Sequence, residues 1–290
     1  MKEGRRNLIQ AAAALLHNPH LSGFFTGEIY KGDSKQVCVP GLNCYSCPGA
    51  VGACPIGSLQ AVLSGGRRGF SYYVTGTILL FGVIFGRLIC GFLCPFGFIQ
   101  DLLYKIRCRK RTVPRRIDKP LRYLKYAVLL ILVILLPMLV RGSYGVGDPW
   151  FCKYLCPAGT LEGGIPLVLG SEGLRSMVGF LFSWKMTVLI AVIALSVVIY
   201  RPFCKYLCPL GAIYGLLNKY SFYQMRVDEH SCTRCRACEK GCGMGVEILK
   251  NINSTECIRC GKCKTVCPTG SIRSGFGRTA PSPAPRRDGE

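Results

Sequence analysis

Eight cysteines between Cys232 and Cys267 recur at short, regular intervals. They form two runs, Cys232-x2-Cys235-x2-Cys238-x3-Cys242 and Cys257-x2-Cys260-x2-Cys263-x3-Cys267, and Pro268 follows the second run. Bacterial ferredoxins with two 4Fe-4S clusters use this spacing, and the fourth cysteine of each run ligates the cluster of the other run. The spacing therefore predicts two such clusters. The predicted ligand sets are Cys232, Cys235, Cys238 and Cys267 for the first cluster, and Cys242, Cys257, Cys260 and Cys263 for the second.

Structural zinc sites are the alternative, because they also use Cys-x2-Cys spacing. Zinc sites usually contain two separated pairs of cysteines, whereas each run here has a triplet followed by a fourth cysteine. One position departs from the ferredoxin pattern: Gly243 follows Cys242 where that pattern has proline. We expect the backbone to differ there, although the thiol is present.

A second pattern, Cys-Pro-x-Gly, occurs four times, beginning at Cys54, Cys94, Cys156 and Cys208. In the last three copies another cysteine precedes by four residues, which gives the pairs Cys90/Cys94, Cys152/Cys156 and Cys204/Cys208. Residues i and i+4 project from one face of a helix, and the proline disfavours helix at the second cysteine. We therefore expect each pair to lie at a helix end with both thiols pointing the same way, as half of a cluster's ligand set.

Apolar stretches separate the four copies and predict transmembrane helices over residues 70–92, 126–140 and 176–200. Residues 7–27 are also uncharged, but Asn18-Pro19-His20 interrupts them, so a spanning helix and an interfacial helix both remain open. The strongly basic stretch 105–125 is typical of a cytoplasmic loop. Successive copies of the motif then alternate between the two membrane faces, and the ferredoxin-like region is cytoplasmic.

This topology groups the remaining cysteines by membrane face. A cluster or another metal, such as copper, is predicted at the inner face, and simple packing of buried thiols is the alternative. At the outer face a cluster with two spare thiols competes with disulfides, which are favoured if that side is oxidising. The inner-face set is Cys90, Cys94, Cys204 and Cys208, and the outer-face set is Cys38, Cys44, Cys47, Cys54, Cys152 and Cys156.

Composition agrees with a membrane metalloprotein. Half of the 290 residues are apolar, the mean hydropathy is +0.30, and nineteen cysteines are more than free thiols would explain. The formal charge of +22 invites a nucleic-acid hypothesis. A cube held by four thiolates carries about −2 when oxidised, which offsets part of this charge. Because many of the remaining cations also lie where membrane topology requires them, we expect no nucleic-acid partner.

Isolated reactive side chains carry less information. Cys108 has no cysteine partner nearby in the sequence, and we expect an ordinary reduced thiol. His17 and His20 are too close on one helix to clamp a haem from both sides, and His230 reads as a solvated loop residue. The sequence shows no nucleotide-binding glycine loop and no acid–base pair that would indicate catalysis.

Residues 70–273 resemble the membrane polyferredoxins of the NapH type, which are related to NosR-like and CcoG-type proteins. The resemblance rests on the membrane spans, on Cys90/Cys94/Pro95 and Cys204/Cys208/Pro209, and on the double ferredoxin run. It implies a subunit that exchanges electrons with quinol or a partner oxidoreductase. The pair Cys152/Cys156 and the segment 38–54 depart from the family pattern and leave the partner undetermined.

The expected fold is an α-helical membrane protein with three or four transmembrane helices and a C-terminal α+β two-cluster ferredoxin-like domain. The predicted divisions are an N-terminal helix and cysteine-rich segment (1–69), a transmembrane region (70–225), the ferredoxin-type domain (226–273) and a disordered tail (274–290). The expected function is electron transfer at the cytoplasmic membrane between iron–sulfur clusters and a quinone or partner protein. A copper or thiol reductase and a redox-sensing or maturation protein are the alternatives.

Overall fold

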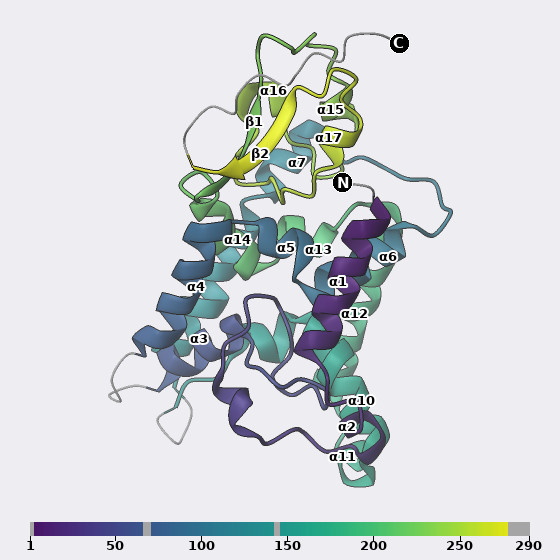
Figure 1. The fold of residues 1–290 in the computed structure, drawn as a ribbon. Coiled ribbons are helices and arrows are strands. Elements are labelled where there is room, and N and C mark those ends of the chain that lie inside the picture. The colour runs from purple at the N-terminus through teal and green to yellow at the C-terminus, as the bar shows by residue number, and fades with distance from the viewer. Residues whose placement is uncertain (1–2, 66–70, 142–145, 278–290) are drawn as a thin grey trace.

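The structure is a computed structural model that describes residues 3–65, 71–141 and 146–277. Most of these residues are helical (Figure 1). The N-terminal segment contains α1 (Glu3–His17), α2 (Gly23–Thr26), a 3-10 helix (Asp33–Gln36) and α3 (Pro55–Ser64). Because α1 ends at His17, the uncharged stretch 7–27 is not one continuous helix. The predicted tail lies outside the described residues from position 278 onward.

The single helix predicted over residues 70–92 is wrong, because the chain turns within it. Here α4 (Tyr72–Phe85) ends at Gly86, whose φ is +56°, and α5 (Leu88–Phe92) follows. Glycine adopts positive φ at little cost, unlike residues with a Cβ. The 14 residues of α4 rise about 21 Å, which is less than the ~30 Å of a bilayer's hydrocarbon core.

Two helices within the described residues are long and apolar enough to cross a membrane. They cover Arg115–Leu139 and Phe180–Val198, with mean hydropathies of 2.0 and 2.1 over their most apolar windows. Only 22% and 17% of those windows are buried inside the protein, so most of their side chains face outward. The first comprises α7 (Arg115–Leu121), α8 (Leu124–Val128), a π-helical segment (Leu129–Leu135) and α9 (Leu136–Leu139), and the second is α12 (Phe180–Val198).

The repeated motifs lie on short helices before, between and after the two long apolar helices. After the first motif pair comes α6 (Pro95–Tyr104), and around the last pair lie α13 (Pro202–Tyr206) and α14 (Pro209–Leu217). Near the middle pair are two π-helical segments (Phe151–Leu155 and Gly159–Gly164), α10 (Ile165–Gly170) and α11 (Glu172–Ser176). The helix α6 packs against both α1 and α12, so the N-terminal helix covers a motif-bearing helix.

The double cysteine run lies between two antiparallel strands at one end of the molecule (Figure 1). Strand β1 (Tyr223–Val227) precedes Cys232 and pairs with β2 (Ile272–Phe276), which follows Cys267, so that Val227 faces Ile272. Three short helices lie between the strands: α15 (Ala237–Lys240), α16 (Ile248–Asn251) and α17 (Lys262–Thr265). The strand pair holds together the two ends of the cysteine-rich stretch.

Candidate metal centres

The four cysteines of the first predicted ferredoxin set line one small pocket, together with Pro268 and Ile272. Burial and the nearby Glu239 and Cys267 raise the pKa of Cys238, which links the triplet to the fourth cysteine of the other run. Cys235 is exposed, whereas Cys238 is buried. The structure therefore brings this set together at the end of the molecule that carries the two strands.

The second predicted set also converges. Burial, and then the neighbouring thiols of Cys257, Cys260 and Cys242, raise the pKa of Cys263 to about 12. Burial likewise raises the pKa of Cys257 to about 12, again with Cys242 and Cys260 as neighbours. A buried thiolate is costly without a positive partner, so this group of thiols suits a metal centre.

The unusual Gly243 after Cys242 has a packing explanation. A Cβ atom at Gly243 would lie 2.6 Å from Cδ1 of the Tyr200 ring, closer than real Cβ contacts. The aromatic ring therefore occupies the space that a proline ring would need. Tyr200 directly precedes the Arg201-x2-Cys204 motif, so this contact joins the ferredoxin-like region to the helical region.

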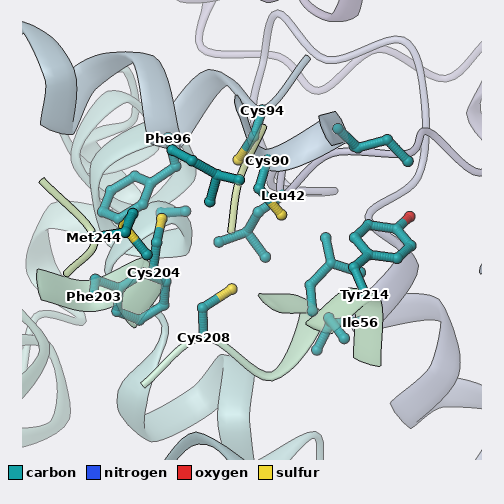
Figure 2. Close-up of a cluster of buried hydrophobic side chains, with 14 of the residues drawn as sticks. Leu42, Ile56, Cys90, Cys94, Phe96, Phe203, Cys204, Cys208, Tyr214 and Met244 are labelled. Carbon is teal, nitrogen blue, oxygen red and sulfur yellow. The ribbon is translucent and has the colours of Figure 1, made fainter. Parts of the chain in front are cut away.

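The four inner-face cysteines belong to one buried cluster. Figure 2 shows Cys90, Cys94, Cys204 and Cys208 around Leu42, with Phe96 and Phe203 beside them. All four are at most 6% exposed. Burial, followed by the thiols of Cys204 and Cys90, raises the pKa of Cys94. The predicted meeting of the two motif pairs is thus present in the structure.

Each Cys-Pro of the three copies at Cys54, Cys94 and Cys208 begins a helix. The cysteine has extended backbone and the proline is the first residue of α3, α6 or α14. The first cysteine of each pair lies at a helix end, as predicted. The second cysteine caps the helical segment Phe151–Leu155 in the middle pair, whereas α5 and α13 end two residues before it in the other two pairs. Proline suits this first position, since its missing N–H would have no helical partner.

This arrangement supplies N–H donors to sulfur. The amide of Gly211 donates to Sγ of Cys208 at 3.4 Å, and Gly159 donates to Cys156 at the same distance. The amides of Gly97 and Gly57 donate in the same way to Cys94 and Cys54. These bonds lower the pKa of the two thiols, although burial raises it by more. A helix N-terminus favours negative charge, so all four copies present a thiol where a thiolate is stabilised.

The outer-face cysteines divide into a compact group and two others. Cys156 lies near Cys152, Cys44 and Cys54, whose thiols together with burial raise its pKa well above normal. Burial also raises the pKa of Cys44 and of Cys152 to about 12. Cys38 lies beside Cys54, and Cys47 lies near Lys35. All nineteen cysteines are free thiols in the described residues.

The spacing of these groups differs from that of a single-ion site. Within the described residues no three His, Cys, Asp or Glu side chains converge closely enough to ligate one metal ion. In a cube each thiolate binds a separate iron corner, so the thiols lie further apart. Converging thiols and N–H donors at sulfur fit a 4Fe-4S cluster.

Two buried arginines were not anticipated from the sequence. Arg87 donates from Nη2 to the carbonyl of Cys204 at 3.0 Å, and Arg201 donates to the carbonyl of Cys90. Each guanidinium is fully buried and has an acidic partner, Glu256 for Arg87 and Asp101 for Arg201. Arg-x2-Cys occurs at both Arg87–Cys90 and Arg201–Cys204, and this repetition is the signal that would have identified them.

The isolated candidates lie apart from these groups. Cys108 is exposed. His17 is buried at the end of α1, and burial lowers its pKa. The ring of His20 contacts the carbonyl oxygen of Pro48, and His230 is exposed.

Comparisons with known proteins agree with the cysteine pattern. A family model described as a 4Fe-4S binding domain matches residues 52–73, 70–114, 126–165 and 180–226, and each of these segments contains one Cys-Pro-x-Gly copy. A second model, also described as a 4Fe-4S binding domain, matches residues 250–273. No solved structure matches the chain.

Several curated proteins are similar over most of the chain. The uncharacterized protein MJ0750 of Methanocaldococcus jannaschii is 30% identical, over 77% of this chain and 86% of the relative. Protein NirI of Paracoccus denitrificans is 29% identical over 79% of this chain, which spans only 33% of NirI. The ferredoxin-type protein NapH of Haemophilus influenzae is 28% identical, over 66% of this chain and 62% of NapH. The predicted resemblance is confirmed: the chain belongs to the 4Fe-4S binding domain family and is related to the ferredoxin-type proteins of the NapH kind.

Proposed function

We propose that this protein is an integral membrane electron-transfer protein that connects cytoplasmic ferredoxin-type centres with a quinone or a partner protein. The family supports 4Fe-4S centres in electron transport, and two apolar helices support membrane association. When bound, such clusters supply one-electron redox chemistry at potentials that the protein environment sets. The chain's own residues hold the clusters, exclude water from them and fix their order.

The single observation that carries the proposal is the contact between the inner-face group and the ferredoxin-like region. A Cβ atom on Gly91 would lie 2.5 Å from the carbonyl oxygen of Ile258, so these backbones touch. Gly91 adjoins Cys90, and Ile258 lies between Cys257 and Cys260. The segments that carry two predicted centres are therefore in direct packing contact.

The cysteine-rich segment 38–54 also makes a backbone contact with the inner-face group, through Gly41. A Cβ atom on Gly41 would lie 3.2 Å from Cα of Cys94. Burial and the thiols of Cys90, Cys38, Cys94 and Cys54 raise the pKa of Tyr214, so this ring lies near both groups. The inner-face group thus packs against the second ferredoxin run at Gly91 and against the segment 38–54 at Gly41.

We assign the ligands accordingly. The first ferredoxin-type centre takes Cys232, Cys235, Cys238 and Cys267, the second takes Cys242, Cys257, Cys260 and Cys263, and the inner-face centre takes Cys90, Cys94, Cys204 and Cys208. Burial and the N–H donors at sulfur support the inner-face set.

The proposed topology places the ferredoxin-like region and the copies at Cys94 and Cys208 on the cytoplasmic side. The copies at Cys54 and Cys156 lie on the opposite side. The pairing of copies supports this arrangement, because Cys94 neighbours Cys204, whereas Cys156 neighbours Cys54. The basic residues of 105–125 support the cytoplasmic orientation. Cysteine-accessibility labelling that found Cys152 in the cytoplasm would contradict it.

The function is tested by purifying the full-length protein anaerobically and measuring iron, acid-labile sulfide and EPR signals. We expect more iron than two clusters hold, and a loss of iron and of one EPR component in Cys90→Ser. Cys108→Ser is the matched control, because Cys108 is exposed and lies outside every group. Unchanged iron and spectra in Cys90→Ser would exclude the inner-face centre.

A further inference from the structure

The sixth residue after each Cys-Pro-x-Gly cysteine is polar and points to a partner copy. These residues are Gln60, Gln100, Glu162 and Tyr214. Gln60 and Tyr214 are fully buried, and Gln100 is 1% exposed. Glu162 is half-buried. Buried polar groups persist where they have partners, so polar residues at the same position of all four copies indicate a shared role.

In the inner-face group the role is contact with the cysteines of the other copy. Nε2 of Gln100 donates to Sγ of Cys204 at 3.1 Å. Tyr214 lies within electrostatic range of Cys90, and its hydroxyl donates to the carbonyl of Pro40 at 2.9 Å. The copy at Cys94 thus contacts the first cysteine of the pair 204/208, and the copy at Cys208 faces the first cysteine of the pair 90/94.

The outer-face group repeats this geometry. Nε2 of Gln60 donates to Sγ of Cys152 at 3.2 Å, as Gln100 does to Cys204. The backbone amide of Cys44 donates to Oε2 of Glu162 at 2.8 Å. Glu162 stands at the repeat position of Tyr214, so Cys44 occupies the place that Cys90 has in the inner-face group.

Glycine contacts place Cys44 beside Cys156, and Cys152 beside Cys54. A Cβ atom on Gly159 would lie 3.7 Å from Sγ of Cys156 and 3.8 Å from Sγ of Cys44. A Cβ atom on Gly57 would lie 3.9 Å from Sγ of Cys152. Both are the motif glycines that donate N–H bonds to a cysteine sulfur.

Cys38 and Cys47 lie near this group, Cys38 beside Cys54 and Cys47 near Glu162, but neither thiol is among the atoms nearest to the motif glycines Gly57 and Gly159. The amide of Cys38 donates to the hydroxyl oxygen of Tyr73, and the Cys38 thiol points toward the carbonyl of Val39. Cys47 lies near Lys35, whose ammonium donates to the carbonyl of Ala50. Neither cysteine has a counterpart in the inner-face group.

We propose that Cys44, Cys54, Cys152 and Cys156 hold a further 4Fe-4S cluster in a site built as a copy of the inner-face site. Cys44 is its fourth ligand, Gln60 donates an N–H bond to the Cys152 thiolate, and Cys38 and Cys47 are not ligands. This assignment rests on the proposed function, since it extends the same set of centres.

The test compares Cys44→Ser with the matched variants Cys38→Ser and Cys47→Ser in anaerobically purified full-length protein. We expect Cys44→Ser alone to lose one cluster's iron and sulfide together with one EPR component. The ferredoxin-type EPR components serve as the check on folding. Equal loss in Cys38→Ser or Cys47→Ser, or no loss in Cys44→Ser, would overturn the assignment.

Two further measurements, of midpoint potential and of disulfide content, test the same ligand assignment. Gln60→Leu should shift the midpoint potential of the component that Cys44→Ser removes to more negative values and leave the others unchanged. Alkylation of unreduced protein followed by mass spectrometry should find no disulfide at Cys44, and a disulfide there would overturn the proposal. Cys204→Ser separates the two hypotheses: if it removes a component and Cys44→Ser does not, only this inference fails, whereas if neither does, the membrane centres of the proposed function fail as well.

Discussion

The guanidinium of Arg87 donates to the backbone carbonyl of Cys204 across 3.0 Å. Arg201 returns the contact, because it donates to the carbonyl of Cys90. Each arginine precedes the first cysteine of its own copy by three residues and contacts the first cysteine of the other copy. The two copies are thus locked together by a reciprocal pair of buried cations that lie beside the proposed thiolates.

Arg87 also ties the ferredoxin-like region to the helices, since it donates to Glu256 at 3.1 Å and to the carbonyl of Thr255 at 2.6 Å. We expect Arg87→Met to lower the free energy of unfolding by about 1–3 kcal/mol, because the carbonyls of Thr255 and Cys204 lose their donor while Glu256 keeps Lys125 as a partner. Equilibrium denaturation in mild detergent measures this change. Arg115→Met is the control, since its pair with Glu247 is exposed and should contribute at most about 1 kcal/mol. Similar losses in both variants would contradict the role of Arg87.

Gly243→Ala tests the packing explanation for the missing proline. The added methyl group would press on the Tyr200 ring, and overpacking typically costs about 1–3 kcal/mol. We expect the ferredoxin-type EPR components to disappear at a lower temperature in this variant. Gly275→Ala in β2 is the control, because a Cβ there meets nothing within 4 Å. Equal thermal stability of the two variants would show that Tyr200 does not exclude a side chain.

Gln100→Leu removes the N–H donor from Sγ of Cys204 but keeps a side chain of similar volume. Hydrogen bonds to the sulfurs raise the reduction potential of an iron–sulfur cluster, because they stabilise the more negative reduced state. We therefore expect the midpoint potential of the inner-face centre to become more negative in an EPR-monitored titration. Gln224→Leu is a surface control, since Gln224 donates to the carbonyl of Lys219. A shift in neither variant would mean that the contact does not affect the centre.

Arg236→Gly should stabilise the ferredoxin-like region. Arg236 has a φ of +58° at the position where the second run has Gly261, whose φ is +77°. A left-handed conformation costs a residue with a Cβ about 1–2 kcal/mol, so glycine should recover on the order of 1 kcal/mol. Arg236→Ala is the matched control, because it removes the charge and keeps the Cβ. A gain of equal size with alanine would assign the effect to charge instead of backbone strain.

Much of the site could be read from local spacing. The triplets around Cys235 and Cys260 and the pairs at Cys94 and Cys208 are close in sequence, so covalent geometry alone limits how far apart their thiols can lie. The long apolar helices were predicted for a similar reason, because length and hydropathy are local properties. The single helix predicted over 70–92 was wrong, because the chain turns at Gly86, which has a positive φ. A side chain at Gly86 would meet Asn218, a contact that the local sequence does not reveal.

The sequence by itself determined the family, the two ferredoxin runs and the existence of four related motifs. The alternation of motifs and apolar stretches also predicted that the copies at Cys94 and Cys208 lie on one face. Only the tertiary structure decided which of the six outer-face thiols lie together, because that depends on packing and not on spacing along the chain. It brought Cys44, but not Cys47, beside Gly159 and Cys156. The tertiary structure also explained why glycine follows Cys242, because the ring of Tyr200 packs against Gly243. These two residues are distant in sequence and meet only through packing.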